Sequence, residues 1–240
     1  MSEDALVLLP GLNCSPALWS RLDVGPAITP ILTERTLEGQ VERLLAELPD
    51  RFALAGLSLG GIVAMALVRR APERVTRLCL MSTTSRPPTP AQHAMWARQR
   101  AALAAGATAR DLQREIKAAL LSPHARASQP QLVEAALAMA DDIGVATLDA
   151  QLALQATRVD ERPGLTRVRC PTMIIAGRDD ALCTLERHQE MHVLLPGSEL
   201  VVLSSCGHLS PLEQPVAVEA ELRRWRRLAA IADGPRLALR

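Results

Sequence analysis

Apolar and polar positions alternate in blocks along the first third of the chain. A continuous apolar run at 5–9 and the mainly apolar segments 52–57 and 75–81 have the length of buried strands. Between them, the segments 37–48 and 59–70 repeat their apolar residues at helical spacing. This order of strand, helix, strand, helix and strand predicts parallel βαβ units in a doubly wound α/β sheet.

A weaker strand is expected at 28–32, where Pro30 argues for an edge position because proline cannot donate a ladder hydrogen bond. The alternation of strands and helices returns after Pro163 and Gly164. Strands are expected at 172–176 and 199–203, and helices at 185–195 and 216–232.

The middle of the chain has a different pattern. It starts at the proline-rich break 86–90, and residues 91 to 155 are rich in Ala, Leu, Arg and Gln. We expect roughly four helices there and no strand. The expected interruptions are Gly106, Pro123, Pro130 and Gly144. The sequence therefore predicts one α/β core, 1–85 and 164–240, with a helical cap inserted at 86–163.

Composition narrows the function classes. The 240 residues are 48% apolar and 22% charged, with a net charge of +1 and 2% aromatic residues. This balance argues against nucleic-acid or membrane partners. The five cysteines are odd in number and lack metal-ligand spacing, so we expect free thiols in a reducing compartment and no metal. The N-terminal apolar run is too short for a signal peptide or a membrane span, so we expect a cytoplasmic location. Oligomeric state is not readable from the sequence.

A single serine interrupts the apolar stretch between the strand at 52–57 and the following helix. The motif is Gly56-Leu-Ser58-Leu-Gly60, a G-x-S-x-G pattern at a strand-to-helix turn. Small residues on both sides permit a tight, strained turn that exposes the serine at the carboxyl edge of the sheet. A glycine-rich packing turn with an incidental serine is the alternative, and the strand and helix context favours a nucleophile.

A serine nucleophile needs a base and a carboxylate. Of the five histidines, His208 lies in the loop after the last predicted strand, at the same sheet edge as Ser58. His188 and His192 are spaced i, i+4 but have no third metal ligand nearby. The loop after 172–176 carries Asp179 and Asp180. Nucleophile, acid and base thus follow one another in that order along the chain.

The landmarks LLPGL, GLSLGG, PERV, CPTMIIAGRDD and CGHLSPLEQP, in this order, resemble those of the α/β-hydrolase fold family, and most of all its small bacterial esterases with a helical cap. The resemblance covers essentially the whole chain. It implies Ser58 as nucleophile and His208 as base, and its G-x-x-D pattern selects Asp180 over Asp179. It further implies an oxyanion hole made by the backbone N–H groups of Leu12 and Leu59.

The resemblance implies a serine hydrolase that cleaves a carboxylic acyl ester through an acyl-enzyme, without a cofactor. Because no cluster of cationic residues marks the cap, we expect the ester to be uncharged and small to medium in size. The same triad also serves thioesterases, lactonases, perhydrolases, carbon–carbon bond hydrolases and tailoring enzymes, and a slow-turnover ligand receptor can keep it. The candidate apolar pocket residues from the cap are Met95, Trp96, Leu120, Leu121 and Met139, and packing of the cap onto the core is the alternative for each of them.

Two further groups of residues stay open. Cys14, Cys183 and Cys206 fall on the loops of the expected site, either as buried packing or as thiols whose modification blocks the pocket. The arginine-rich stretch 223–227 is either the solvated face of the last helix or a partner-binding patch.

Overall fold

The computed structural model describes residues 4–228. Within them, six strands form one sheet whose order is β2-β1-β3-β4-β5-β6, and every pairing is parallel. The strands are β1 (Ala5–Leu9), β2 (Ala27–Ile28), β3 (Phe52–Leu57), β4 (Val75–Met81), β5 (Thr172–Gly177) and β6 (Glu199–Leu203). The fold class predicted from the sequence, a doubly wound parallel sheet, is confirmed.

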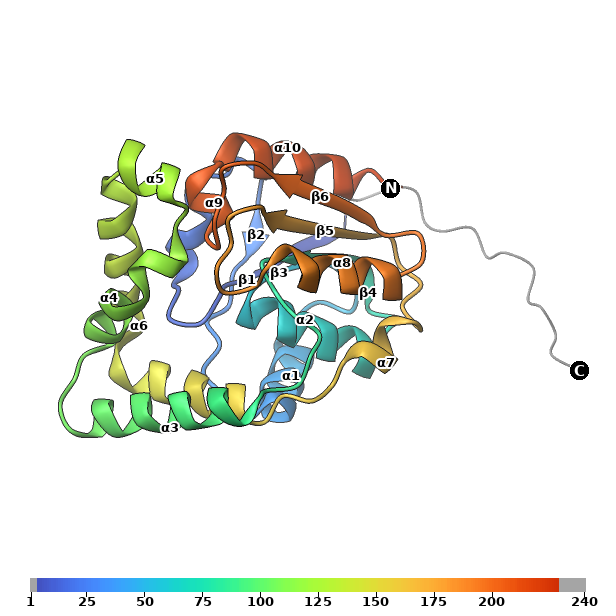
Figure 1. The fold of residues 1–240 in the computed structure, drawn as a ribbon. Coiled ribbons are helices and arrows are strands. Elements are labelled where there is room, and N and C mark those ends of the chain that lie inside the picture. Colours follow the sequence, from blue (N-terminus) through green and yellow to red (C-terminus); the bar gives the residue numbers. More distant parts are fainter. Residues whose placement is uncertain (1–3, 229–240) are drawn as a thin grey trace, which may run out of the picture.

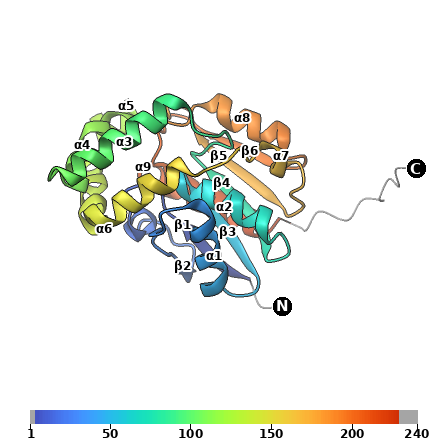
Figure 2. The same cartoon turned by 90° about the horizontal axis from the view of Figure 1, so that it is seen from below.

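Helices cover both faces of this sheet. One face carries α1 (Leu37–Glu47), α2 (Leu59–Arg70), α7 (Arg162–Leu165) and α8 (Leu185–Leu194), which Figure 2 shows on the viewed side. The other face carries the short 3-10 helix η1 (Pro16–Trp19), α9 (Ser210–Glu213) and α10 (Pro215–Arg226). Each strand serves both layers because its side chains alternate: Leu6 and Leu8 pack on one side, Val7 and Leu9 on the other.

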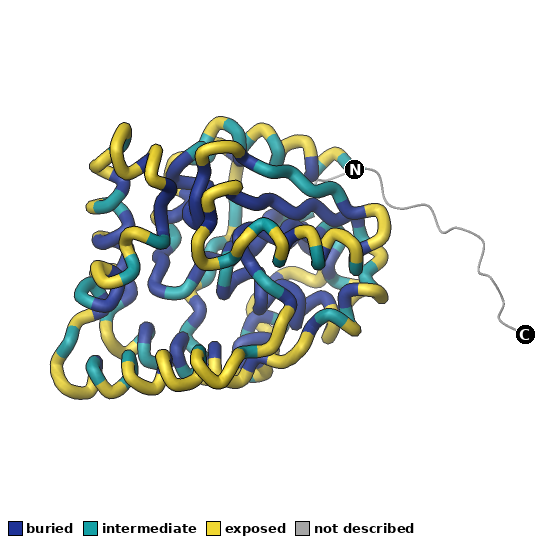
Figure 3. Tube along the Cα trace, in the orientation of Figure 1, coloured by how far each residue is buried: buried dark blue, intermediate teal, exposed yellow. Residues whose placement is uncertain are grey.

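The helical block predicted for the middle of the chain is present. It consists of α3 (Pro90–Ala104), α4 (Ala109–Leu120), α5 (Pro123–Ser128) and α6 (Gln131–Ala156). Figure 1 shows these helices gathered at one side of the core, where the strands end. Figure 3 shows the inner strands of the sheet as the buried centre and the outward helix faces as exposed. The cap has its own apolar cluster, which includes Trp96, Leu103 and Ile143. We propose 86–163 as its extent.

Three of the expected interruptions of the helical block coincide with a helix start or a bend. Gly144 bends α6 with φ 71° and ψ 174°, a conformation that suits glycine. Pro123 is the first residue of α5, and Pro130 caps α6. The weak strand expected at 28–32 shrinks to the edge strand β2, as the Pro30 argument implied. The closing helix ends at Arg226, and residues 229–232 of its expected range lie outside the described residues.

Candidate active site

Ser58 occupies a strained turn between β3 and α2. Its backbone has φ 55° and ψ −113°, in a region that L-residues seldom adopt. The Ser58 N–H donates to the carbonyl of Met81 at 2.9 Å, and its carbonyl accepts from Thr83 Oγ1 at 2.8 Å. The end of the neighbouring strand β4 therefore holds the turn in place from both sides.

The residues two positions before and after Ser58, Gly56 and Gly60, leave no space for a side chain. A Cβ added at Gly56 would lie 2.3 Å from the Gly60 carbonyl oxygen, and one added at Gly60 would lie 2.1 Å from that of Leu9. Both distances are far below van der Waals contact, and the clashing atoms are backbone, which cannot move aside. The glycines of the G-x-S-x-G motif are thus required by the close approach of β1, β3 and α2.

His208 and Asp180 form a buried pair at the same edge of the sheet. The Nδ1 atom of His208 lies 2.9 Å from Oδ2 and 3.1 Å from Oδ1 of Asp180. Because an ionised carboxylate only accepts, Nδ1 carries the proton and Nε2 is left free to accept one. Asp180 Oδ1 also accepts the N–H groups of Leu182 and Cys183, at 2.8 and 2.9 Å.

The pKa of Asp180 reflects these contacts. Burial alone would raise it, but the neighbouring His208 and the backbone donors of Cys183 and Leu182 outweigh burial, so the pKa lies below its ordinary value. Asp180 is therefore ionised at neutral pH and able to stabilise a charged imidazole on His208. Asp179, the other candidate acid, is exposed and does not take this place.

The loops that carry Asp180 and His208 are locked together. The Asp179 N–H donates to the Cys206 carbonyl at 2.8 Å, and a Cβ at Gly177 would lie 2.2 Å from the Gly207 carbonyl oxygen. The buried carboxylate of Glu213 accepts the Gly207 N–H at 3.0 Å and the Ser122 N–H at 3.1 Å. Glu213 thereby joins the His208 loop to the start of α5.

Ser58 and His208 line one cavity of about 180 Å³. Its walls come from the core loops and from the cap. Of the apolar residues expected there, Met95, Trp96 and Leu120 line it. Met139 and Leu121 are instead buried in the core cluster between cap and sheet. Polar cap side chains that no motif pointed to, Gln92, Gln99, Gln155 and Arg158, also line the cavity.

The two expected oxyanion residues come from different turns. Leu12 lines the cavity in the turn after β1, and Leu59 is the first residue of α2. An N–H in the first turn of a helix has no carbonyl partner within that helix, and the helix dipole favours negative charge there. The Leu59 N–H is therefore suited to an oxyanion.

Asn13, next to Leu12, ties this turn to the cap. Its N–H donates to Gln151 Oε1 at 2.8 Å, and its side-chain amide donates to the Ala109 carbonyl and Gln113 Oε1, both at 3.0 Å. Asn13 is buried and has φ 57°, a left-handed conformation that Asn tolerates better than most residues. The cap thus positions the turn that presents the Leu12 N–H.

We expect Asn13→Ala to lower the free energy of unfolding by about 3 kcal/mol. The change leaves the Ala109 carbonyl and Gln113 Oε1 without their donor, and alanine tolerates the positive φ less well than asparagine. Asn13→Gly is the matched control: it lacks the same side-chain bonds but accepts the backbone angle, so it should be about 1 kcal/mol less damaging. Urea denaturation measures both. Equal stability of Asn13→Ala and the parent would contradict the structural role.

The three cysteines near the site are poor nucleophiles. Burial raises the pKa of Cys14 to about 12, with a partly opposing hydrogen bond from the Gly11 backbone. Burial also raises the pKa of Cys183, with the Asp180 charge adding to it, and that of Cys206. Cys14 and Cys183 line the cavity, while Cys206 is buried two residues before His208 in the chain.

We therefore expect iodoacetamide at pH 7 to alkylate these thiols at least about ten times more slowly than it alkylates glutathione, since only the thiolate reacts. Ester hydrolysis should persist throughout. Intact mass and activity, followed together over time, provide the measurement. Rapid inactivation in step with alkylation of Cys183 would instead support a thiol that blocks the pocket.

The histidine pair on α8 has structural partners. His188 is buried; its Nδ1 donates to the Thr184 carbonyl and its Nε2 accepts the Thr83 N–H. His192 pairs with Ser198 Oγ at 2.8 Å. In residues 4–228, no group of three or more His, Cys, Asp or Glu side chains is arranged to hold a metal ion. Over the same residues, no helix is long and apolar enough to cross a membrane.

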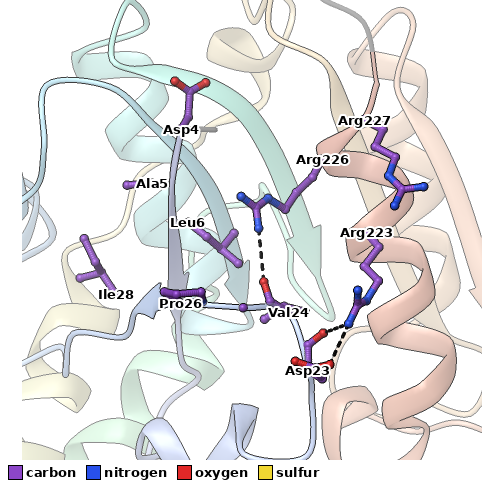
Figure 4. Close-up of a pocket in the computed structure, with 12 residues that line it drawn as sticks. Asp4, Ala5, Leu6, Asp23, Val24, Pro26, Ile28, Arg223, Arg226 and Arg227 are labelled. Atoms are coloured by element: carbon purple, nitrogen blue, oxygen red, sulfur yellow. Dashed lines mark hydrogen bonds and ion pairs between the residues drawn. The ribbon is translucent and has the colours of Figure 1, made fainter. Parts of the chain in front are cut away.

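A larger cavity, about 670 Å³, lies where β1 begins and α10 ends (Figure 4). The arginine-rich stretch borders it but is engaged with its own chain. Arg223 pairs with Asp23, and Arg226 donates to the Val24 carbonyl (Figure 4). Arg224 pairs with Glu199 and Glu221 on the surface. These contacts favour the reading of a solvated helix face.

The sequence analysis did not single out Asn13, Glu213 or Arg158. Each has a hydrogen-bond partner far away along the chain, and a local pattern cannot predict such a contact. The position of Glu213 in CGHLSPLEQP, close after the expected base, is the one local signal that pointed toward the site.

A strained serine at a strand-to-helix turn and a buried histidine–aspartate pair at the same edge of a parallel sheet define a capped α/β hydrolase. A comparison with family models agrees: the alpha/beta hydrolase fold family matches residues 9–215. The chain therefore belongs to this family, and it is an ester-hydrolysing enzyme, as the sequence predicted.

Individual relatives narrow the comparison. The chain is 34% identical to a pimeloyl-[acyl-carrier protein] methyl ester esterase of Aromatoleum aromaticum, over 90% of this chain and 95% of the relative. It is 29% identical to the enzyme of the same name from Nitrosomonas europaea, over 75% and 73% of the two chains. A thermophilic esterase from Thermogutta terrifontis, 24% identical, shares the fold with a TM-score of 0.78 over 93% of this chain and 89% of that one.

Proposed function

We propose that this enzyme is a serine esterase that cleaves small-to-medium carboxylic acyl esters, with Ser58 as nucleophile, His208 as base and Asp180 as the acid that orients it. The contact between His208 Nδ1 and Asp180 Oδ2, at 2.9 Å, carries the proposal. It directs Nε2 of His208 away from Asp180, and both His208 and Ser58 line the same cavity.

In the proposed reaction His208 removes the proton from Ser58 as its oxygen attacks the acyl carbonyl. The N–H groups of Leu12 and Leu59 hold the resulting oxyanion, each worth about 3 kcal/mol of barrier. The protonated His208, stabilised by Asp180, then gives its proton to the leaving alcohol. Water activated by His208 attacks the acyl-enzyme and releases the acid.

The size of the cavity limits the substrate. About 180 Å³ is below the usual range for drug-sized ligands, so the group that enters is small. The Aromatoleum aromaticum relative is named for a methyl ester, whose alcohol is the smallest there is, and methyl esters are the first members of the proposed class to test. A thioesterase, lactonase or carbon–carbon bond hydrolase remains an alternative use of the same residues.

A fluorophosphonate probe tests the nucleophile. We expect intact mass to show one adduct on the parent and peptide mapping to place it on Ser58. Ser128→Ala, which removes an exposed serine on α5, serves as the matched control and should keep the adduct. Well-folded parent protein without an adduct would contradict the proposal and favour a binding protein that kept the fold. A panel of esters, thioesters and lactones then separates the alternatives.

A further inference from the structure

Arg158 is the cationic side chain on the wall of the candidate active site. It follows the end of α6 and lines the cavity together with Ser58 and His208. Only 8% of its surface is exposed. A guanidinium stays charged at neutral pH, so the cavity wall holds a nearly buried positive charge.

The partners of Arg158 are all neutral. Its Nη1 donates to Gln155 Oε1 at 3.0 Å and its Nη2 to Gln92 Oε1 at 3.2 Å. The guanidinium lies over the Trp96 ring, 5.1 Å from the ring centre. Its Nε is buried and has no hydrogen-bond partner among the described residues. Several of its N–H groups are therefore not engaged by the protein.

Carboxylates close to Arg158 in sequence are bound elsewhere. Asp160 pairs with Arg162 at 2.6 Å, and the buried carboxylate of Glu161 pairs with Arg69 at 2.9 Å. Burial lowers the pKa of Arg158, as expected for a buried cation that lacks a full counter-charge. An unpaired buried charge is costly, and a fold that only needed packing here would do better with an apolar residue.

We propose that Arg158 binds a carboxylate of the substrate, so that the preferred ester carries a negative charge at one end. The planar fork of a guanidinium suits a carboxylate, which accepts two parallel N–H bonds. The small cavity limits the spacer between this carboxylate and the ester to a few carbons. This inference rests on the proposed esterase function, and it replaces the expectation of an uncharged substrate.

The carboxylate has two possible places in the substrate, the acyl part or the alcohol part. Two matched pairs of esters separate them. Monomethyl glutarate and methyl pentanoate differ by a carboxylate in place of a methyl group at the end of the acyl chain. Acetoxyacetate and ethyl acetate differ in the same way on the alcohol side. All four release acid, which a pH-stat measures without a chromophore.

For one of the pairs, we expect the parent enzyme to have a kcat/KM at least about ten times higher for the charged ester. Arg158→Met should lower that value about 10- to 100-fold, mainly through KM, and change the neutral ester less than about threefold. Arg158→Lys keeps a point charge without the fork and should fall in between. Arg98→Met, an exposed arginine on α3, is the control and should change neither ester.

The outcomes are distinguishable. If Ser58 takes up the fluorophosphonate and the neutral esters are hydrolysed, but neither charged ester is preferred, the inference about Arg158 is wrong and the esterase proposal stands. Parallel losses on charged and neutral esters in Arg158→Met would assign Arg158 a packing role. Absence of both labelling and hydrolysis would overturn the esterase proposal and this inference with it.

A measurement on the parent alone covers the case in which Arg158→Met does not fold. Glutarate and pentanoate are the acids released from the first pair of esters, and both can compete with the fluorophosphonate probe. We expect glutarate to slow labelling of Ser58 at a concentration at least about ten times lower than pentanoate. Equal protection by the two acids would exclude a carboxylate site for the acyl part of the substrate.

Discussion

Ser58→Ala is expected to lower kcat for ester hydrolysis by about 10⁵-fold, because the reaction loses the atom that forms the acyl-enzyme. The protein should remain folded, since the Ser58 side chain makes no capping bond to α2. Residual turnover above background would come from substrate binding and the oxyanion donors alone. Steady-state kinetics with a methyl ester, beside circular dichroism, makes the measurement.

Ser82→Ala is the matched control for this loss. Ser82 lies just beyond the neighbouring strand β4, is buried, and also has a positive φ, 45°. Its side chain, unlike that of Ser58, does not line the cavity. We expect its kcat to stay within about threefold of the parent. A Ser58→Ala enzyme that kept more than about one per cent of the parent rate would exclude Ser58 as nucleophile.

Asp180→Asn is expected to lower kcat by about 10⁴-fold. The asparagine oxygen can still accept the N–H groups of Leu182 and Cys183, so the loop should keep its shape. The amide NH₂ then faces Nδ1 of His208, which favours the tautomer with its proton on Nε2. In that tautomer His208 cannot take the proton from Ser58, and the charge that stabilised the imidazolium is gone.

Asp179→Asn makes the same chemical change one residue earlier and is the control for Asp180→Asn. Asp179 is exposed, so its kcat should change less than about threefold. The pair of variants decides between the two acids that the sequence left open before the family pattern was applied. A large loss in Asp179→Asn with an active Asp180→Asn would reverse the assignment of the acid.

The cap combines two tasks in the proposed mechanism. Through Asn13 it holds the turn that presents the Leu12 N–H, and through Arg158, Gln92 and Trp96 it forms the wall that meets the substrate. Changes in the cap are therefore expected to alter both the rate and the choice of substrate. The two effects separate experimentally, because Asn13 does not line the cavity and Arg158 does.

Local sequence patterns were sufficient for the core of the fold. β1 and β3 are apolar throughout and β4 is apolar from Leu78 to Met81, because parallel strands are buried on both faces. Helical spacing marked α1 and α2. The Ser58 turn was equally readable, because the G-x-S-x-G pattern between a strand and a helix is local, although the steric demand on Gly60 comes from Leu9 on β1. The edge strand β2 is shorter than the strand expected at 28–32. Pro30 has no N–H for pairing, and an edge strand has a neighbour on one side only.

The tertiary structure decided what depends on distant contacts. Met139 is an apolar cap residue that was expected in the pocket, yet on α6 it is buried in the core cluster. The neutral partners of Arg158, Gln92 and Gln155, come together because cap helices α3 and α6 meet. The sequence by itself determined the parallel sheet, its helical insertion and the three loops that carry Ser58, Asp180 and His208, because strand order and local sterics fix them. Only the packing of cap on core decided which side chains line the cavity, because burial and the pairing of charges depend on segments that meet only in the folded chain.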